Sequence, residues 1–173
     1  MKSEWGKGFT LRYWWQEMAP DQVPGGEGVI HYDAGRGVYA LHNDFVGQER
    51  QLDYLLDERK GVAWVSELRD GKRSCSVHQT DRRVELDRHL SAGKVVGEGV
   101  VLGQGVRLIE YHEAGDHDRW LWFVDDTGKP RRFLTWTHHG RILVLHDVIA
   151  FEAVESFPAR TFAPDPGWGC PEG

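Results

Sequence analysis

Short stretches rich in β-branched and aromatic residues recur along the chain, with glycine-containing turns between them. In the first stretch, residues 9–16, apolar side chains alternate with others, so that Phe9, Leu11, Tyr13 and Trp15 fall on one face of an extended strand. Segments of this kind at regular intervals are typical of an antiparallel β meander or barrel.

The same signal predicts further strands down the chain, and one stretch departs from it. Val84–Ala92 lacks the alternation and ends before Gly93, which predicts a short helix. A sheet of about nine or ten strands curls or closes. The predicted fold class is therefore mostly β: a single curved antiparallel sheet, a half-barrel, with one short helix that plugs one side. The remaining predicted strands are Gly28–Asp33, Val38–Asn43, Gln51–Leu56, Gly61–Leu68, Ser74–Thr80, Val106–His112, Arg119–Asp125, Arg131–Thr137 and Ile142–Glu152.

The length of 173 residues fits one domain, which we place at residues 1–163. Residues 164–173 contain three prolines and three glycines and predict an irregular C-terminal tail, ordered by Trp168. Aromatic residues occupy both faces of the strands around Tyr13-Trp14-Trp15 and Trp120–Phe123. A sheet with one wet face alternates apolar and polar residues. We therefore expect one face to pack a core and the other to line a ligand cavity or to be covered by the tail.

Charge and composition exclude several classes of function. A net charge of -6 argues against nucleic-acid binding, which calls for a basic face. No apolar run reaches the length that crosses a bilayer, and the first residues lack the apolar core of a secretory signal, so we expect a cytoplasmic protein without a membrane partner. Cys75 and Cys170 are then expected to be free thiols.

No motif for a cofactor or metal is present. The nine histidines show no metal-ligand spacing, and His138 and His139 are adjacent, which would point them to opposite faces of a strand. Nucleophile motifs and phosphate-binding glycine loops are absent. We therefore expect no metal and no cofactor.

Polar residues inside apolar strands are the candidates for chemistry: His31, His42, Asn43 and Glu58. A carboxylate in an aromatic cavity would have a raised pKa and could exchange protons near neutral pH. The residues alone favour the simpler interpretation, in which Glu58 begins the charged turn Asp57–Lys60 and faces water.

Several segments follow one another in a recognisable order: Tyr13-Trp14 with Met18–Gln22, Gly28–Asn43, Leu41–Glu58, Val100–Gly103, Gly128–Arg132, Phe157-Pro158 and Phe162. Their order resembles the prodeoxyviolacein synthase family of violacein biosynthesis, whose fold is that of the lipoprotein carrier LolA. Ependymin-type proteins are a weaker match. The likeness spans most of the chain at low identity, without a specific motif.

The resemblance implies a half-barrel around a hydrophobic pocket that steers an unstable aromatic intermediate without a cofactor. It matches Asn43 and Glu58 to a family asparagine and glutamate, and loosely places His146 where the family has an arginine. Thr10 and Arg12 depart from the family's first strand, which puts the same substrate and reaction in doubt.

Two functions follow as hypotheses. The first is a cofactor-independent enzyme of secondary-metabolite biosynthesis that acts on a hydrophobic or aromatic small molecule. The alternative is a non-catalytic carrier or sensor of a lipid or other apolar molecule. A homodimer is left open. In the enzyme hypothesis Glu58 is the acid/base, Asn43 orients the substrate, and His146 or Arg12 stabilises charge. The substrate-binding residues are Arg12, Tyr13, Trp14, Trp15, His31, His42, Trp64 and Trp122.

Overall fold

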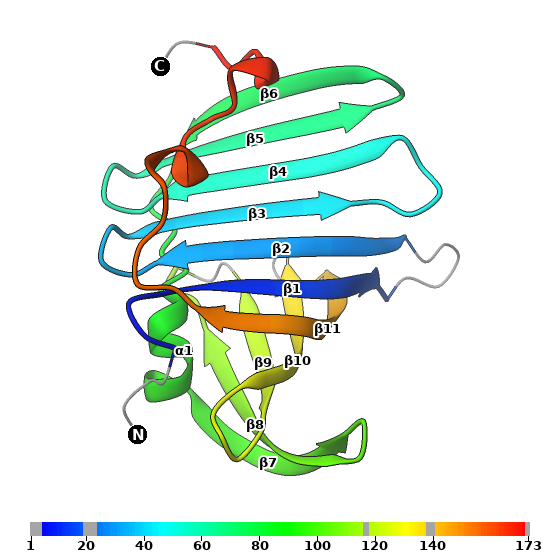
Figure 1. The fold of residues 1–173 in the computed structure, drawn as a ribbon, viewed down its shortest axis with the longest axis vertical. Coiled ribbons are helices and arrows are strands. Elements are labelled where there is room, and N and C mark those ends of the chain that lie inside the picture. The colour runs from blue at the N-terminus through cyan, green and yellow to red at the C-terminus, as the bar shows by residue number, and fades with distance from the viewer. Residues whose placement is uncertain (1–4, 19–23, 116–117, 138–140, 172–173) are drawn as a thin grey trace.

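In the computed structural model, which describes residues 5–18, 24–115, 118–137 and 141–171, all strands belong to one antiparallel sheet of eleven strands (Figure 1). Their order across the sheet is β6-β5-β4-β3-β2-β1-β11-β10-β9-β8-β7. One α-helix, α1 (Leu86–Ala92), separates β6 from β7. The strands are β1 (Gly8–Glu17), β2 (Gly25–Asp33), β3 (Val38–Asp44), β4 (Arg50–Asp57), β5 (Val62–Arg69), β6 (Lys72–Gln79), β7 (Lys94–Val101), β8 (Gln104–His112), β9 (Arg119–Val124), β10 (Pro130–Thr137) and β11 (Ile142–Ala153).

The sheet consists of two meanders joined at one seam. Strands β1–β6 form the first meander, which we call the arm, and β7–β11 form the second. The first and last strands of the chain, β1 and β11, pair with each other from Phe9↔Ala153 to Glu17↔Val144. The second meander curls away from the arm around α1 (Figure 1), so the sheet is an open half-barrel.

The predicted fold class, a single curved antiparallel sheet with one short helix, is confirmed. The predicted strand count was low by one because β7 was not predicted. Gly97 and Gly99 interrupt this strand, and three of its four valines, Val95, Val96 and Val100, are exposed. The helix begins at Leu86, two residues later than predicted, because Glu85 before it has a left-handed backbone (φ 44°).

The concave face of the half-barrel holds an aromatic core. Every second residue of β1, from Phe9 to Trp15, is buried there, as the alternation predicted. On the second meander, the rings of Trp122 and Phe133 stack 4.6 Å apart between centroids. Aromatic side chains bury large areas, so this cluster dominates the packing of the domain. The core consists of Trp5, Phe9, Leu11, Tyr13, Trp15, Ile30, Tyr32, Tyr39, Phe45, Leu56, Ala63, Val84, Leu86, Ile109, Trp120, Trp122, Val124 and Phe133.

Helix α1 closes one end of the concave face. Its His89 is buried, accepts a hydrogen bond from Trp122 Nε1 at Nδ1 (3.0 Å) and donates one from Nε2 to the Val84 carbonyl (2.7 Å). Burial lowers the pKa of His89 to about 3, so the ring is neutral and its two nitrogens have fixed roles. The predicted plug is therefore present, and it is held by buried hydrogen bonds as well as by apolar contacts.

The convex face of the arm is covered by the C-terminal tail. Phe162 of the short 3-10 helix η1 (Ala159–Phe162) packs with Val38 and Leu55, and Trp168 of η2 (Pro166–Trp168) joins the same cluster with Trp64. The tail is thus ordered at Trp168, and Trp64 on this face lies under it, whereas Trp14 stays 47% exposed.

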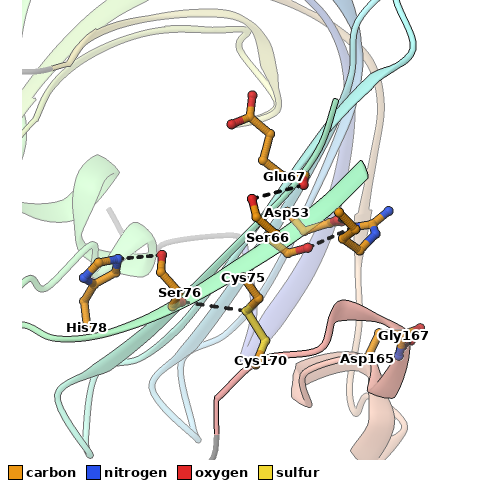
Figure 2. The surroundings of a disulfide bond; sticks show 11 residues. Asp53, Ser66, Glu67, Cys75, Ser76, His78, Asp165, Gly167 and Cys170 are labelled. Atoms are coloured by element: carbon orange, nitrogen blue, oxygen red, sulfur yellow. Dashed lines mark hydrogen bonds and ion pairs between the residues drawn. A yellow bond between two sulfur atoms is a disulfide. The ribbon is translucent and has the colours of Figure 1, made fainter. Parts of the chain in front are cut away.

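A disulfide joins Cys75 on β6 to Cys170 in the tail, across 95 positions of sequence (Figure 2). The expectation of free thiols was wrong. The tail crosses the arm and brings the second cysteine onto the edge strand, a contact that no local sequence pattern encodes.

Candidate functional site

The predicted binding residues fall on opposite faces of the sheet. Residues directly opposite in an antiparallel pair share a face. Two rows of paired residues face the concave side: Asn43–Gly28–Tyr13 and Trp15–His146. Trp122 joins them through its pairing with Phe133, which in turn pairs with His146. The convex face instead carries Arg12, Trp14, His31, His42 and Trp64.

Two residues of the convex group, His31 and His42, make polar contacts, while Trp64 packs in the apolar cluster under the tail. His42 binds Asp53 (Nδ1 to Oδ1, 2.6 Å) and Asp44 (Nε2 to Oδ2, 3.2 Å). Hydrogen bonding to Asp53 is the largest effect on His42 and raises its pKa despite burial. Thr10 Oγ1 and His31 Nδ1 are 2.9 Å apart. These residues satisfy one another, and the ten predicted site residues on the two faces cannot line a single cavity.

Glu58 has a structural contact that sequence reasoning missed. Its Oε1 accepts hydrogen bonds from the backbone N–H groups of Val84 (2.8 Å) and Glu85 (3.0 Å). Burial raises the pKa of Glu58, and these two bonds oppose that rise. The carboxylate thus anchors the segment that enters α1, instead of facing water as the charged turn suggested.

Glu58 and Asn43 lie far apart. Asn43 pairs with Leu52 on β4, whereas Glu58 follows Asp57 at the other end of that strand. At about 3.3 Å per residue, the six-residue step from Leu52 to Glu58 spans about 20 Å. The two residues that the family resemblance matched do not meet in one site.

The structural role of Glu58 can be tested by comparing two substitutions. Glu58→Ala leaves both backbone donors without their acceptor and is expected to lower the free energy of unfolding by about 1–3 kcal/mol. Glu58→Gln keeps a side-chain oxygen as acceptor and should lower the free energy of unfolding by less than half as much as Glu58→Ala. Urea unfolding of both variants measures the difference. Equal stability of Glu58→Ala and the parent protein would show that these two hydrogen bonds do not stabilise the fold.

Tyr13 and Asn43 form a hydrogen-bonded pair across the concave face. The Tyr13 hydroxyl donates to Asn43 Oδ1 at 2.8 Å, reaching over the intervening strand β2. Gly28 lies between them, and a Cβ at that position would overlap both the tyrosine ring and the asparagine oxygen. Within the described residues, the Asn43 amide nitrogen makes no hydrogen bond. Its N–H groups are therefore available to a ligand.

His146 lies beside this pair but is suited to packing rather than charge. Its ring stacks on Phe133 (4.0 Å between centroids) and meets the edge of Tyr13 (5.0 Å). Burial lowers the pKa of His146 to about 3, so it is neutral at physiological pH. Its Nδ1 is buried and makes no hydrogen bond in the described part of the chain. The proposed role in stabilising charge does not fit a neutral ring.

Next to Asn43 the concave face carries a block of half-buried apolar side chains. Leu41 faces Tyr54, and Asn43 faces Leu52, on the neighbouring strands β3 and β4. Leu41, Leu52 and Tyr54 all pack against the aromatic core but remain partly exposed. We call Leu41, Asn43, Leu52 and Tyr54 the concave patch.

The segment that leads into α1 reaches the concave patch at Tyr54 and is fixed there by buried charges. Arg82 binds both Glu113 oxygens (2.9 and 3.1 Å) and Asp118 (2.7 Å), and its guanidinium lies over the Tyr54 ring. Trp120 Nε1 donates to the same Glu113 carboxylate (2.8 Å). Burial lowers the pKa of Arg82, but the two carboxylates outweigh it and the pKa is raised. No sequence motif signals this cluster.

Other features of the described residues do not point to a second site. Hollows of about 680 Å³, between β7–β8 and β9–β10, and about 620 Å³, at the turns beside Arg50 and Arg69, are lined mainly by polar and charged residues. Among the described positions no three metal-ligating side chains gather, and no helix is long and apolar enough to cross a membrane.

No family model and no curated protein matches the chain. Similar solved structures include an uncharacterized conserved protein from Thermus thermophilus, at 11% identity, covering 91% of this chain and 85% of that one with a TM-score of 0.54. Others are a chain of the Pseudomonas aeruginosa MucA/MucB complex (13%, 95% and 58%, TM-score 0.44) and a LolA superfamily protein from Nitrosomonas europaea (9%, 91% and 90%, TM-score 0.41). The first match shows a shared fold, and the lower TM-scores of the other two carry no conclusion.

Proposed function

We propose that the domain is a non-catalytic binding module for an apolar small molecule with a polar group, held on the concave patch. The observation that carries the proposal is the set of half-buried side chains Leu41, Leu52 and Tyr54, which continue the aromatic core toward solvent. Beside them lies the Asn43 amide, whose N–H groups make no hydrogen bond within the described residues. Ligand sites are mostly apolar surfaces with a few polar groups that fix orientation.

The energetics favour an apolar ligand. Covering exposed apolar surface contributes about 25 cal/mol per Å². The patch lies on a rigid base, because the Tyr13–Asn43 hydrogen bond and the packing of Tyr13 over Gly28 hold its polar end. A preformed site avoids the cost of ordering side chains on binding.

Binding is supported better than the cofactor-free biosynthetic reaction that the violacein-family resemblance implied. An acid/base catalyst must reach the substrate, yet the Glu58 carboxylate is committed to two backbone donors at the far end of β4. His146 is neutral and buried. The carrier alternative requires neither residue to react.

Fluorescence titration with dansyl-labelled undecanoic acid tests the proposal. The parent protein is expected to bind the probe with enhanced emission. Leu41→Arg places a charge in the patch and should weaken binding about tenfold or more, since burying an unpaired charge is costly. Trp14→Arg is the matched control, because Trp14 is 47% exposed on the convex face and should leave the affinity unchanged.

The control also separates the two faces as binding surfaces. If Trp14→Arg abolished probe binding and Leu41→Arg did not, the ligand would lie on the convex face and the proposed site would be wrong.

A further inference from the structure

The C-terminal segment 154–171, here called the strap, runs from the end of β11 across the convex face of the arm to β6 (Figure 1). Its first residue is held by a backbone hydrogen bond from Val154 to Gly8 (2.9 Å). Helix η1 contacts β3, and η2 contacts β6. The strap therefore spans most of the arm and ties its two sides together.

Beyond Val154, the strap is attached to the sheet by rings and one covalent bond. All hydrogen bonds of its described residues from Glu155 onward stay within the strap, such as Thr161 to Pro158 and Trp168 to Asp165. Phe157 packs against His31 (5.7 Å between centroids), and Phe162 lies under Arg36 (5.4 Å). These contacts hold the inner half of the strap.

The outer half, residues 163–171, has weaker non-covalent anchorage. Most of its residues are exposed, and Trp168, itself half-buried, is its one apolar contact with the sheet cluster among the described residues. The disulfide between Cys75 and Cys170 is thus the main attachment of this half to the edge strand.

We propose that the strap is a redox-sensitive brace that fixes the curvature of the arm, and thereby the affinity of the concave patch, while its disulfide is closed. The inference rests on the proposed function. Disulfides persist in oxidising compartments and open in the reducing cytoplasm, so the compartment sets the state of the brace.

The connection from brace to patch runs through paired strands. Cys75 points toward the strap, whereas the next residue, Ser76, lies on the other side of β6 (Figure 2). Strand β6 pairs along its length with β5, and β5 places Glu67 opposite Leu52 of the patch. An edge strand released from the strap leaves β4 and β5 freer to move, and a looser site loses more conformational entropy on binding.

The opening reaction is thiol–disulfide exchange with a dithiol. One thiolate of the reductant attacks a sulfur of the Cys75–Cys170 bond, which breaks and leaves a mixed disulfide. The second thiol of the reductant displaces the protein sulfur and closes the reductant's own disulfide. Two electrons and two protons pass to the protein, which ends with two thiols.

Limited chymotrypsin digestion of the full chain, oxidised or treated with dithiothreitol, tests the release. Trp168 lies in the outer half of the strap and is half-buried. Cleavage after Trp168 is expected to accelerate about tenfold on reduction, because release of the outer half exposes this site. All samples are fully reduced after the digest stops, so the disulfide cannot retain the cleaved peptide. The Cys75→Ser/Cys170→Ser double variant should be cleaved fast with or without dithiothreitol.

The dansyl-undecanoate titration, repeated in both redox states, tests the consequence. We expect about threefold to tenfold weaker binding after reduction, and no redox effect in the double serine variant. Unchanged cleavage would overturn the brace. Equal affinities in the two redox states would overturn the control of the patch by the strap, and would leave the proposed function intact. No probe binding in either state would contradict the proposed function itself.

Discussion

Replacing Arg82 by methionine is expected to lower the free energy of unfolding by about 3–5 kcal/mol, because it leaves a buried carboxylate without its partner. The side chain of Glu113 has no solvent exposure, and within the described residues its remaining side-chain hydrogen bond comes from Trp120. A buried, uncompensated charge costs far more than the ion pair contributes. Urea unfolding followed by tryptophan fluorescence measures the loss.

Two further variants give this prediction its controls. The double variant Arg82→Met/Glu113→Gln removes the charge while keeping an acceptor for Trp120, and should recover most of the loss. Arg88→Met breaks an exposed pair with Glu85 and should leave the unfolding midpoint unchanged. An Arg82→Met loss no greater than that of Arg88→Met would mean that the plug does not depend on the buried pair.

Gly28→Ala is expected to lower the free energy of unfolding by about 3 kcal/mol, since overpacking forces neighbouring groups to move. It should also weaken probe binding at least about tenfold. The added methyl group would overlap the Tyr13 ring and the Asn43 oxygen, and so break the hydrogen bond that supports the patch. Stability and probe affinity are measured on the same preparation.

Gly97→Ala on β7 is the matched control, because a Cβ there meets nothing within 4 Å. It should leave both stability and affinity unchanged. If Gly28→Ala bound the probe as the parent does, Tyr13 and Asn43 would not support the site.

Much of the fold could be predicted from alternation alone. The buried row from Phe9 to Trp15 follows from a period-two pattern, and ten of the eleven strands follow from short β-branched and aromatic runs between turns. Strand β7 shows no such alternation, since Val95, Val96 and Val100 are exposed and Val101 alone of its valines is buried. The late helix start depends on Glu58, a partner 26 positions before Val84.

The site could be predicted less well, because alternation does not say which face is concave. Trp64 and Trp15 look equally suited to a pocket in sequence, yet the strap covers the first and the core encloses the second. The strap's position depends on a disulfide across 95 positions, which no local pattern encodes. Asn43 lies on the concave face and accepts a hydrogen bond from Tyr13, whereas Glu58, matched to the same family site, lies at the far end of β4.

The central claim, that an apolar ligand binds the concave patch, is tested most directly by amide NMR during titration with undecanoic acid. We predict saturable shifts for Leu41, Asn43, Leu52 and Tyr54, with the convex network around His42 unaffected. Shifts confined to the convex face, or none up to the solubility limit of the ligand, would contradict the claim.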